Sequence, residues 1–286
     1  MQALIDHTRT HKEFLFVYPV VSRRSNGISL GVNLSPHRQC NFDCLYCEVD
    51  RSPDARSLPK FSNTTMIGEL KELINSVLDG SLFEQKLFND VPQSMRRLND
   101  IAFSGDGEPT AEPVFLEACQ SVSELKNSMS LDDVKIVLIS NSTMFHKPDV
   151  QKGLAILEEN KGEIWAKLDA GTENYYNIID KTHVPFKRVL DNILLVAQKR
   201  PIIIQTLFTV LDGVPISKNE VLAYANRLKE IKDHEGLISE VHLHTLARPP
   251  AYSRVESLTK NQLDEMAGWI KSIIDIPVTT FAGRAG

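Results

Sequence analysis

An α/β fold is predicted for this chain of 286 residues from two patterns in its sequence. From about residue 99 onward, short apolar runs alternate with amphipathic stretches, which is typical of parallel βαβ units. Polar and glycine-rich segments follow the apolar runs directly, as in SGDGEPT, LDAGTE and HLHTLARPP. In a β/α barrel that end of the strands carries the active site. Periodicity alone leaves two arrangements open, a doubly wound sheet and a barrel.

Six strands and six helices are expected in alternation. The apolar runs predict strands over residues 27–35, 99–105, 134–141, 163–171, 201–210 and 238–246. Apolar residues at helical spacing predict helices over residues 65–80, 111–126, 148–160, 185–200, 217–232 and 259–273. With no internal repeat or linker, we expect a single domain over residues 1–286, with its core at about 18–255 and a C-terminal helix and tail at 256–286.

The composition is that of a soluble globular protein, with 42% hydrophobic and 24% charged residues. The formal net charge of −5 argues against strong non-specific binding to nucleic acid or to an anionic membrane. Residues 1–25 do not resemble a signal peptide, and no apolar run reaches the roughly 18 residues that a membrane helix needs. Clustered, sparse cysteines are typical of a reducing compartment, so a cytoplasmic location is expected.

Three of the four cysteines lie within one short stretch, CNFDCLYC, directly after the first predicted strand. Cys40, Cys44 and Cys47 favour a [4Fe–4S] cluster that is held at three irons, with the fourth iron open to a ligand. The alternative is a structural zinc site that His37 completes, because zinc usually takes four protein ligands. Cys119 lies on an apolar helical face and is predicted to be a buried core thiol.

The spacing C-x3-C-x2-C after the first strand resembles the radical S-adenosylmethionine (SAM) superfamily. This resemblance implies a partial (β/α)6 TIM-like barrel of the radical SAM type, with a [4Fe–4S] cluster and SAM as cofactors. In that family the open iron binds the amino and carboxylate groups of SAM. One electron then cleaves SAM to methionine and a 5′-deoxyadenosyl radical, which abstracts hydrogen from the substrate. The resemblance therefore implies an iron–sulfur enzyme of the oxidoreductase or transferase type.

The segment FSGDGEPT, after the second predicted strand, resembles the GGEP element of the same superfamily. Gly105 and Gly107 allow a close approach of the backbone to a ligand, and Glu108 could accept a hydrogen bond from the SAM ammonium. Two further SAM contacts are implied at the end of the third strand, by Ser140 and Asn141 in ISNST.

Tyr46, which precedes the third cysteine, matches a family position whose residue packs near the adenine of SAM. The alternative is that Tyr46 simply anchors the loop. Substrate-side residues are expected on the later strands. Lys167 and Asp169 lie in KLDAGTE, which resembles the SLDAG element of the family, and they alternate on one face. They point into the barrel mouth or form a buried pair that holds the barrel together.

The two strands that follow contain further polar side chains. Gln205 is an inward candidate for the substrate, or a satisfied core amide. Arg248 is placed to bind an anionic group such as a phosphate or carboxylate. His242 and His244 share one face of the last predicted strand. They could form a metal pair, a proton-transfer pair, a substrate anchor or a solvent-facing pair on an edge strand.

One segment indicates which branch of the radical SAM superfamily the chain resembles. PVVSRRSNGISLGVNLSPHRQCNFDCLYCEVDR is similar to the corresponding segment of bacterial Fe–S oxidoreductases of the wyosine (4-demethylwyosine synthase-like) type. The wyosine enzymes condense pyruvate-derived carbons onto methylated guanosine in tRNA and carry a second, N-terminal set of cysteines. Residues 1–39 contain no cysteine, and the chain has no basic excess. These two departures count against the tRNA function, which is kept as an alternative.

The function expected from the sequence is thus a radical SAM enzyme with an unidentified substrate. Alternatives are a tRNA-modifying wyosine-like enzyme, a glycyl-radical-type activator of another protein, and a zinc-stabilised interaction module without enzymatic activity. The expected partners are a substrate (small molecule, protein or tRNA) and a reductase, flavodoxin or ferredoxin as electron donor. No membrane partner is expected.

Overall fold

The computed structural model describes residues 11, 13–22, 24, 26–51, 60–248 and 250–283. The chain divides into two compact units. Unit 1 comprises the described residues of 1–39, 56–139 and 147–163, and unit 2 those of 40–55, 140–146 and 164–286. The single domain expected over residues 1–286 stays a prediction.

Unit 1 is built on four strands, which are hydrogen-bonded in the order β1, β2, β3 and β4. Their bounds are Val17–Ser22, Gly27–Val32, Leu98–Phe103 and Lys135–Ser140. The last three run parallel, as predicted, whereas β1 is antiparallel to β2. Strand β1 is absent from the sequence prediction because Pro19 interrupts its apolar run. Proline is tolerated there because β1 stands at the end of the strand order.

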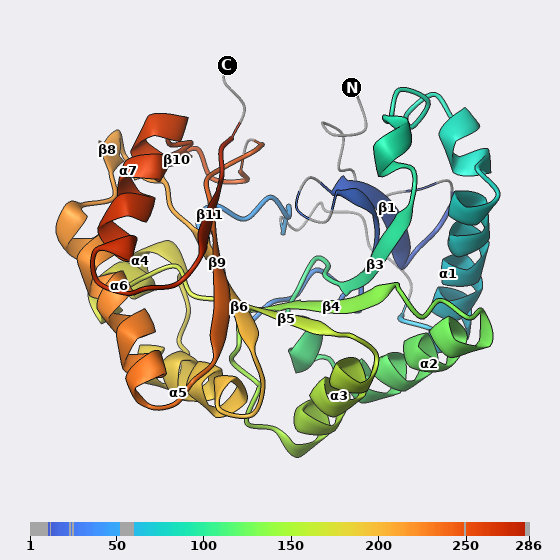
Figure 1. Ribbon diagram of the computed structural model, residues 1–286, viewed down its shortest axis with the longest axis horizontal. Helices are drawn as coiled ribbons and strands as arrows, with labels where there is room; N and C mark the ends of the chain where they lie inside the picture. The colour runs from blue at the N-terminus through green and yellow to red at the C-terminus, as the bar shows by residue number, and fades with distance from the viewer. Residues whose placement is uncertain are drawn as a thin grey trace. The chain divides into compact units, whose positions relative to one another are not determined.

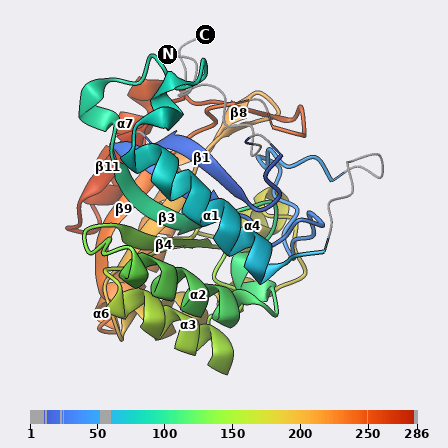
Figure 2. The same ribbon diagram turned by 90° about the vertical axis from the view of Figure 1, so that its right-hand side faces the viewer.

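Three helices belong to unit 1: α1 (Asn63–Leu78), α2 (Phe115–Ser128) and α3 (Pro148–Glu159). Helices α2 and α3 pack against each other (Figure 2). The predicted start of α2 at residue 111 is wrong. Pro109–Ala111 forms a separate 3₁₀ turn, and Glu112 is extended, as a residue before proline prefers to be.

Unit 2 contains four parallel strands in the order β5, β6, β9 and β11. Their bounds are Glu163–Lys167, Ile202–Leu207, Ile238–His244 and Val278–Phe281. The helices of this unit are α4 (Glu173–Ile179), α5 (Phe186–Ala197), α6 (Lys218–Asp233) and α7 (Lys260–Lys271). In Figure 1, α6 and α7 lie on one side of β6, β9 and β11, and the light-blue cysteine loop lies on the other. A small second sheet is formed by β7 (Val210–Leu211), β8 (Val214–Pro215) and β10 (Val255–Glu256).

Strand β9 is not the last strand of unit 2, because β11 pairs with it in parallel. The interpretation of His242 and His244 as a solvent-facing pair on an edge strand is therefore wrong. His242 is buried, and both histidine rings contact Phe281 of β11. The sequence prediction lacks β11 because only four residues form it, after the helix α7.

The register places polar side chains of three neighbouring strands in one row. Lys167 of β5 is opposite Gln205 of β6, which is opposite His242 of β9. Partners across a parallel ladder point to the same face of the sheet. Strands β5 and β6 end earlier than predicted, at Lys167 and Leu207, so Asp169 lies in the loop after β5.

None of the helices in the described part of the chain has the length and apolar character that a membrane crossing needs.

Candidate functional site

The loop that carries the three cysteines is attached on one side to the segment after α4. The backbone N–H of Asp43 donates to the Asp180 carbonyl at 3.1 Å, and that of Leu45 donates to the Ile179 carbonyl at 2.9 Å. The hydroxyl of Thr182 donates to the Asn41 carbonyl at 2.7 Å. These bonds hold the first half of the loop on residues 179–182.

The second half of the loop is attached to the segment that follows β9. The Ala251 N–H donates to the Cys47 carbonyl at 2.9 Å. Arg248 forms an ion pair with Glu48 at 2.6 Å between Nη2 and Oε2. Arg248, predicted to bind an anionic group of a ligand, thus meets a carboxylate of the cysteine loop itself.

A third attachment reaches the middle of the loop. The Tyr252 hydroxyl donates to the carboxylate of Asp43 at 2.8 and 2.9 Å, and Lys181 pairs with the same carboxylate at 2.7 Å. The Lys181 ammonium also lies 4.4 Å from the centre of the Tyr252 ring. Burial acts to raise the pKa of Asp43, but the bonds to Lys181 and Tyr252 outweigh it and lower the pKa.

Each cysteine sulfur has a different surrounding. Nη1 of Arg51 donates to Cys47 Sγ at 3.0 Å, and the N–H of Phe42 donates to Cys40 Sγ at 3.5 Å. The Cys44 thiol donates to Asp180 Oδ1 at 3.4 Å. Burial and the charge of Asp180 raise the pKa of the Cys44 thiol well above its usual value.

The donor set fits an iron–sulfur cluster in its chemistry, because three soft sulfur ligands lie on one loop with N–H donors directed at two of them. Among the described residues, which include His37 and the cysteines, no three side chains of the metal-binding types are gathered around a point that could hold one metal ion. A [4Fe–4S] cluster would bind each thiolate at a different iron, so it does not need the three sulfurs to meet at one point. His37 Nε2 lies 3.5 Å from Glu112 Oε1.

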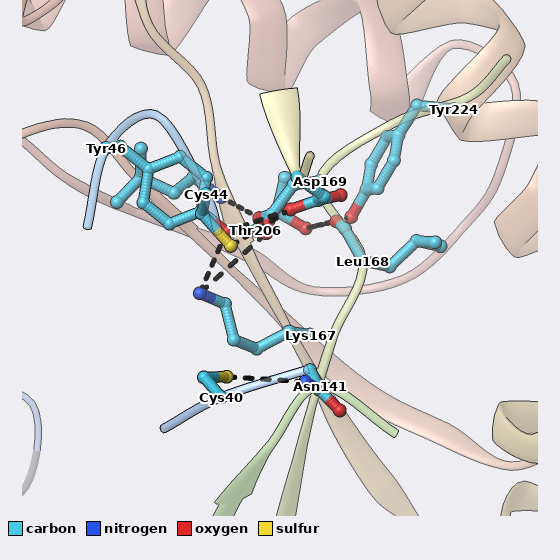
Figure 3. Close-up of polar contacts among 11 residues, drawn as sticks. Cys40, Cys44, Tyr46, Asn141, Lys167, Leu168, Asp169, Thr206 and Tyr224 are labelled. Carbon is cyan, nitrogen blue, oxygen red and sulfur yellow. Dashed lines mark hydrogen bonds and ion pairs between the residues drawn. The ribbon is translucent and has the colours of Figure 1, made fainter. Parts of the chain in front are cut away.

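Tyr46 joins the cysteine loop to the end of β5 through a buried polar network (Figure 3). Its hydroxyl donates to Asp169 Oδ2 and to Asp180 Oδ1, the latter at 3.2 Å. Lys167 Nζ donates to the Tyr46 oxygen at 2.9 Å and lies 3.8 Å from Asp169 Oδ2. The other Asp169 oxygen accepts the N–H of Leu207 at 2.6 Å. Asp169 therefore links the loop, β5 and β6.

The charges of this network shift each other's pKa. Burial acts to lower the pKa of Lys167, but Asp169, Cys44 and Asp180 outweigh it and raise the pKa above its ordinary value. Burial and the charge of Asp169 raise the pKa of Asp180. Burial and Asp169 also raise the pKa of Tyr46. Lys167 is thus held as a cation by its neighbours.

The loop after β4 also faces the cysteines. Asn141 Nδ2 donates to Asn41 Oδ1 at 2.7 Å and lies 4.0 Å from Cys40 Sγ (Figure 3). Ser140 Oγ accepts the N–H of Ser142 at 3.0 Å. The buried side chain of Asn192 fixes this turn by donating to the carbonyls of Ser142 and Thr143 at 2.8 and 2.9 Å.

In unit 1, the GDGEP segment packs tightly against the residues that follow β2. A Cβ atom on Gly105 would lie 2.3 Å from Asn33 Oδ1, and one on Gly107 would lie 2.1 Å from the Gln39 carbonyl oxygen. Only glycine permits these approaches. Glu108 is buried and accepts the N–H of Thr110 at 3.0 Å, which begins the 3₁₀ turn.

The polar row of Lys167, Gln205 and His242 begins at the Tyr46–Asp169 network and continues across β6 and β9. Gln205 is half-buried on β6. His242 Nε2 lies 3.1 Å from Glu240 Oε2, and its ring meets Trp165 edge to face. The His244 ring stacks on Phe281 with 4.6 Å between centres. The row places Lys167, Gln205 and His242 on one face.

Several residues of the site were not predicted from the sequence. Arg51 and Asn41 lie beside or within the cysteine motif, so their position was a usable signal. Asp180 and Asn192 carry no such signal, because they follow or occupy ordinary helices far along the chain. The structure assigns Cys119 to the core, fully buried as predicted.

No family model matches this sequence. A UPF0026 protein of Helicobacter pylori is 28% identical over 249 residues, which cover 86% of this chain and 70% of that protein. Among solved structures, Streptococcus suis SuiB bound to S-adenosylmethionine is similar with a TM-score of 0.59 and 12% identity, over 91% of this chain and 52% of SuiB. TYW1 with a lysine–pyruvate adduct bound is similar with a TM-score of 0.53 and 14% identity, over 87% of this chain and 74% of TYW1.

Likeness at these identities shows the fold. The predicted fold class, an α/β partial barrel of the radical SAM type, is confirmed. The predicted resemblance to the wyosine-type proteins is borne out at the level of the fold, by the similarity to TYW1.

Proposed function

We propose that this protein is a radical SAM enzyme in which Cys40, Cys44 and Cys47 hold a [4Fe–4S] cluster with one open iron. The observation that carries the proposal is the cysteine loop, which is attached on both sides within unit 2 and has N–H donors on two of its three sulfurs. The likeness of the fold to SAM-bound SuiB supports it.

When bound, the cluster would supply one electron, taken from an external reductant, to cleave a C–S bond of SAM. The products are methionine and a 5′-deoxyadenosyl radical able to abstract hydrogen. The residues of this chain bind and orient. From the family motifs, we assign SAM contacts to Gly105, Gly107, Glu108, Ser140 and Asn141. Tyr46 carries a second role besides any adenine contact, because its hydroxyl ties the loop to Asp169.

Lys167 acts in this proposal as a fixed cation. The TYW1 structure holds a lysine–pyruvate adduct, and an amine that forms such an adduct must first lose its proton. The neighbouring anions raise the pKa of Lys167 and so keep it protonated. This environment favours electrostatic positioning of an anionic substrate group, together with Gln205 on the same face, over attack on a carbonyl.

The proposed partners are an organic substrate with an abstractable hydrogen (a small molecule, a protein or a tRNA) and a one-electron donor of the flavodoxin or ferredoxin class. A cytoplasmic location is proposed because the cluster needs reduced thiolates.

The test is anaerobic reconstitution of the full chain with iron and sulfide. We expect a brown protein with about four irons per chain that converts SAM to 5′-deoxyadenosine when dithionite is added. The Cys44→Ala variant should lose most of both properties. Cys119→Ala removes a thiol outside the loop and should keep both. Stoichiometric zinc without iron would instead support the interaction module, and unchanged turnover in Cys44→Ala would refute the enzyme proposal.

A further inference from the structure

Arg51, which no family motif includes, is a cation in contact with a cysteine sulfur. Its Nη1 donates to Cys47 Sγ at 3.0 Å. The side chain is half-buried, which removes part of its hydration. A hydrogen bond from a guanidinium to a thiolate is charge-assisted and stronger than one between neutral groups.

The influence of Arg51 extends to the whole loop. Burial acts to lower its pKa, yet the charges of Cys47, Cys40 and Cys44 raise it. Arg51 also contributes to the lowered pKa of Asp43 on the same loop. A single guanidinium is therefore within electrostatic reach of all three proposed ligands.

Three other cations of unit 2, Lys181, Arg248 and Lys167, lie beside carboxylates. Lys181 pairs with Asp43 at 2.7 Å, and Arg248 pairs with Glu48 at 2.6 Å. Lys167 lies 3.8 Å from Asp169. Arg51 differs because its hydrogen bond goes to a sulfur, so its charge acts directly on the metal ligands.

We propose that Arg51 is a positioning residue that sets the reduction potential of the cluster held by Cys40, Cys44 and Cys47. This inference rests on the proposed function. Reduction by one electron, supplied by a low-potential reductant, adds one negative charge to a group that already carries three thiolates. A fixed cation and a hydrogen bond to a ligand sulfur stabilise the more negative state, and both raise the potential.

The experiment measures the midpoint potential of the reconstituted full chain. Dithionite is added stepwise in the presence of redox mediators, and the reduced fraction is read by electron paramagnetic resonance. In Arg51→Gln, we expect the ratio of reduced to oxidised protein at the wild-type midpoint to fall about tenfold, a shift of about 59 mV to lower potential. Arg51→Lys keeps the charge and should change that ratio less than about threefold.

The matched control is Arg254→Gln, which removes an exposed guanidinium that pairs with Asp212 away from the cysteines. It should leave the midpoint unchanged. If Arg51→Gln loses its iron while Arg51→Lys retains it, the proposal is supported, since the charge is then needed to hold the thiolates.

Three results overturn the proposal: an unchanged midpoint in Arg51→Gln with a full iron content, loss of iron in both Arg51 variants, or an equal shift in Arg254→Gln. Wild-type protein that binds no iron would overturn the proposed function and this inference together. If wild-type protein binds a cluster and cleaves SAM, and the midpoint potential is the same in Arg51→Gln, this inference alone is overturned.

Discussion

Asp169 is the residue on which the polar network of unit 2 depends. One of its oxygens accepts the Tyr46 hydroxyl, and the other accepts the Leu207 N–H. The Nζ of Lys167, whose side chain is a quarter exposed, lies 3.8 Å from Asp169 Oδ2. Removing the negative charge would leave a largely desolvated ammonium beside Tyr46, which costs free energy. The Lys167–Asp169 pair anticipated from KLDAGTE is present with only Asp169 fully buried, and Lys167 also donates to Tyr46 of the cysteine loop.

We expect Asp169→Asn to lower the free energy of unfolding by about 2 kcal/mol, less than for a fully buried pair because solvent reaches Lys167. Urea unfolding of the metal-free protein measures this. Asp191→Asn is the control, because it breaks an exposed pair with Lys187 on α5 and should cost under about 0.5 kcal/mol. Equal stability of the two variants would contradict the role of Asp169.

At the scale of elements, the cysteine loop is ordered by two segments that are distant from it in sequence. Residues 179–182, at and after the end of α4, bind its first half, and Arg248 and Ala251, after β9, bind its second half. Asp43 receives bonds from both segments, through Lys181 and Tyr252. A loop attached at several points loses less entropy when a ligand orders it, so the attachments favour metal retention.

Tyr252→Phe removes one hydroxyl from this attachment and keeps the ring that faces Lys181. We expect the reconstituted variant to lose iron to a chelator about fivefold faster than wild type, which corresponds to about 1 kcal/mol, the typical net contribution of one hydrogen bond. Thr280→Val is the matched control, because it deletes a hydroxyl that donates to the exposed Asp264 at 2.8 Å. A rate of iron loss equal to that of Thr280→Val would show that Tyr252 does not order the loop.

At the scale of the whole molecule, binding of cofactors is linked to folding. A ligand that binds only the native chain stabilises it by mass action, by about 2.7 kcal/mol at a concentration 100 times its Kd. The proposed SAM contacts within unit 2 come from two segments far apart in the sequence, at Tyr46 and at residues 140–141. SAM should therefore bind the folded chain and not the unfolded one.

We expect SAM at that excess to raise the melting temperature of reconstituted wild-type protein by several degrees, measured anaerobically by calorimetry. Cys44→Ala should show a much smaller rise, because the iron that would bind the amino and carboxylate groups is missing. Methionine and adenosine added together serve as the ligand control. An equal rise in wild type and Cys44→Ala would place SAM binding elsewhere on the chain.

Local patterns were sufficient for most of the regular structure. Helices α3, α5, α6 and α7 and strands β2, β3, β4 and β9 lie within a few residues of their predicted bounds, because amphipathic periodicity and capping residues are visible in a short window. Strands β1 and β11 were not predicted. The proline in β1 and the shortness of β11 leave little apolar periodicity to detect.

The donor set of this protein can be read from one short stretch of its sequence: three thiols at C-x3-C-x2-C, a tyrosine between them and an arginine four residues after the last. Those groups are close because they are neighbours along the chain. The residues that surround this donor set depend on how the chain folds. Asp180 reaches Cys44 across 136 residues and Tyr252 reaches Asp43 across 209. Such partners come together only when the strands pair and the helices bury their apolar faces, so no local pattern records them.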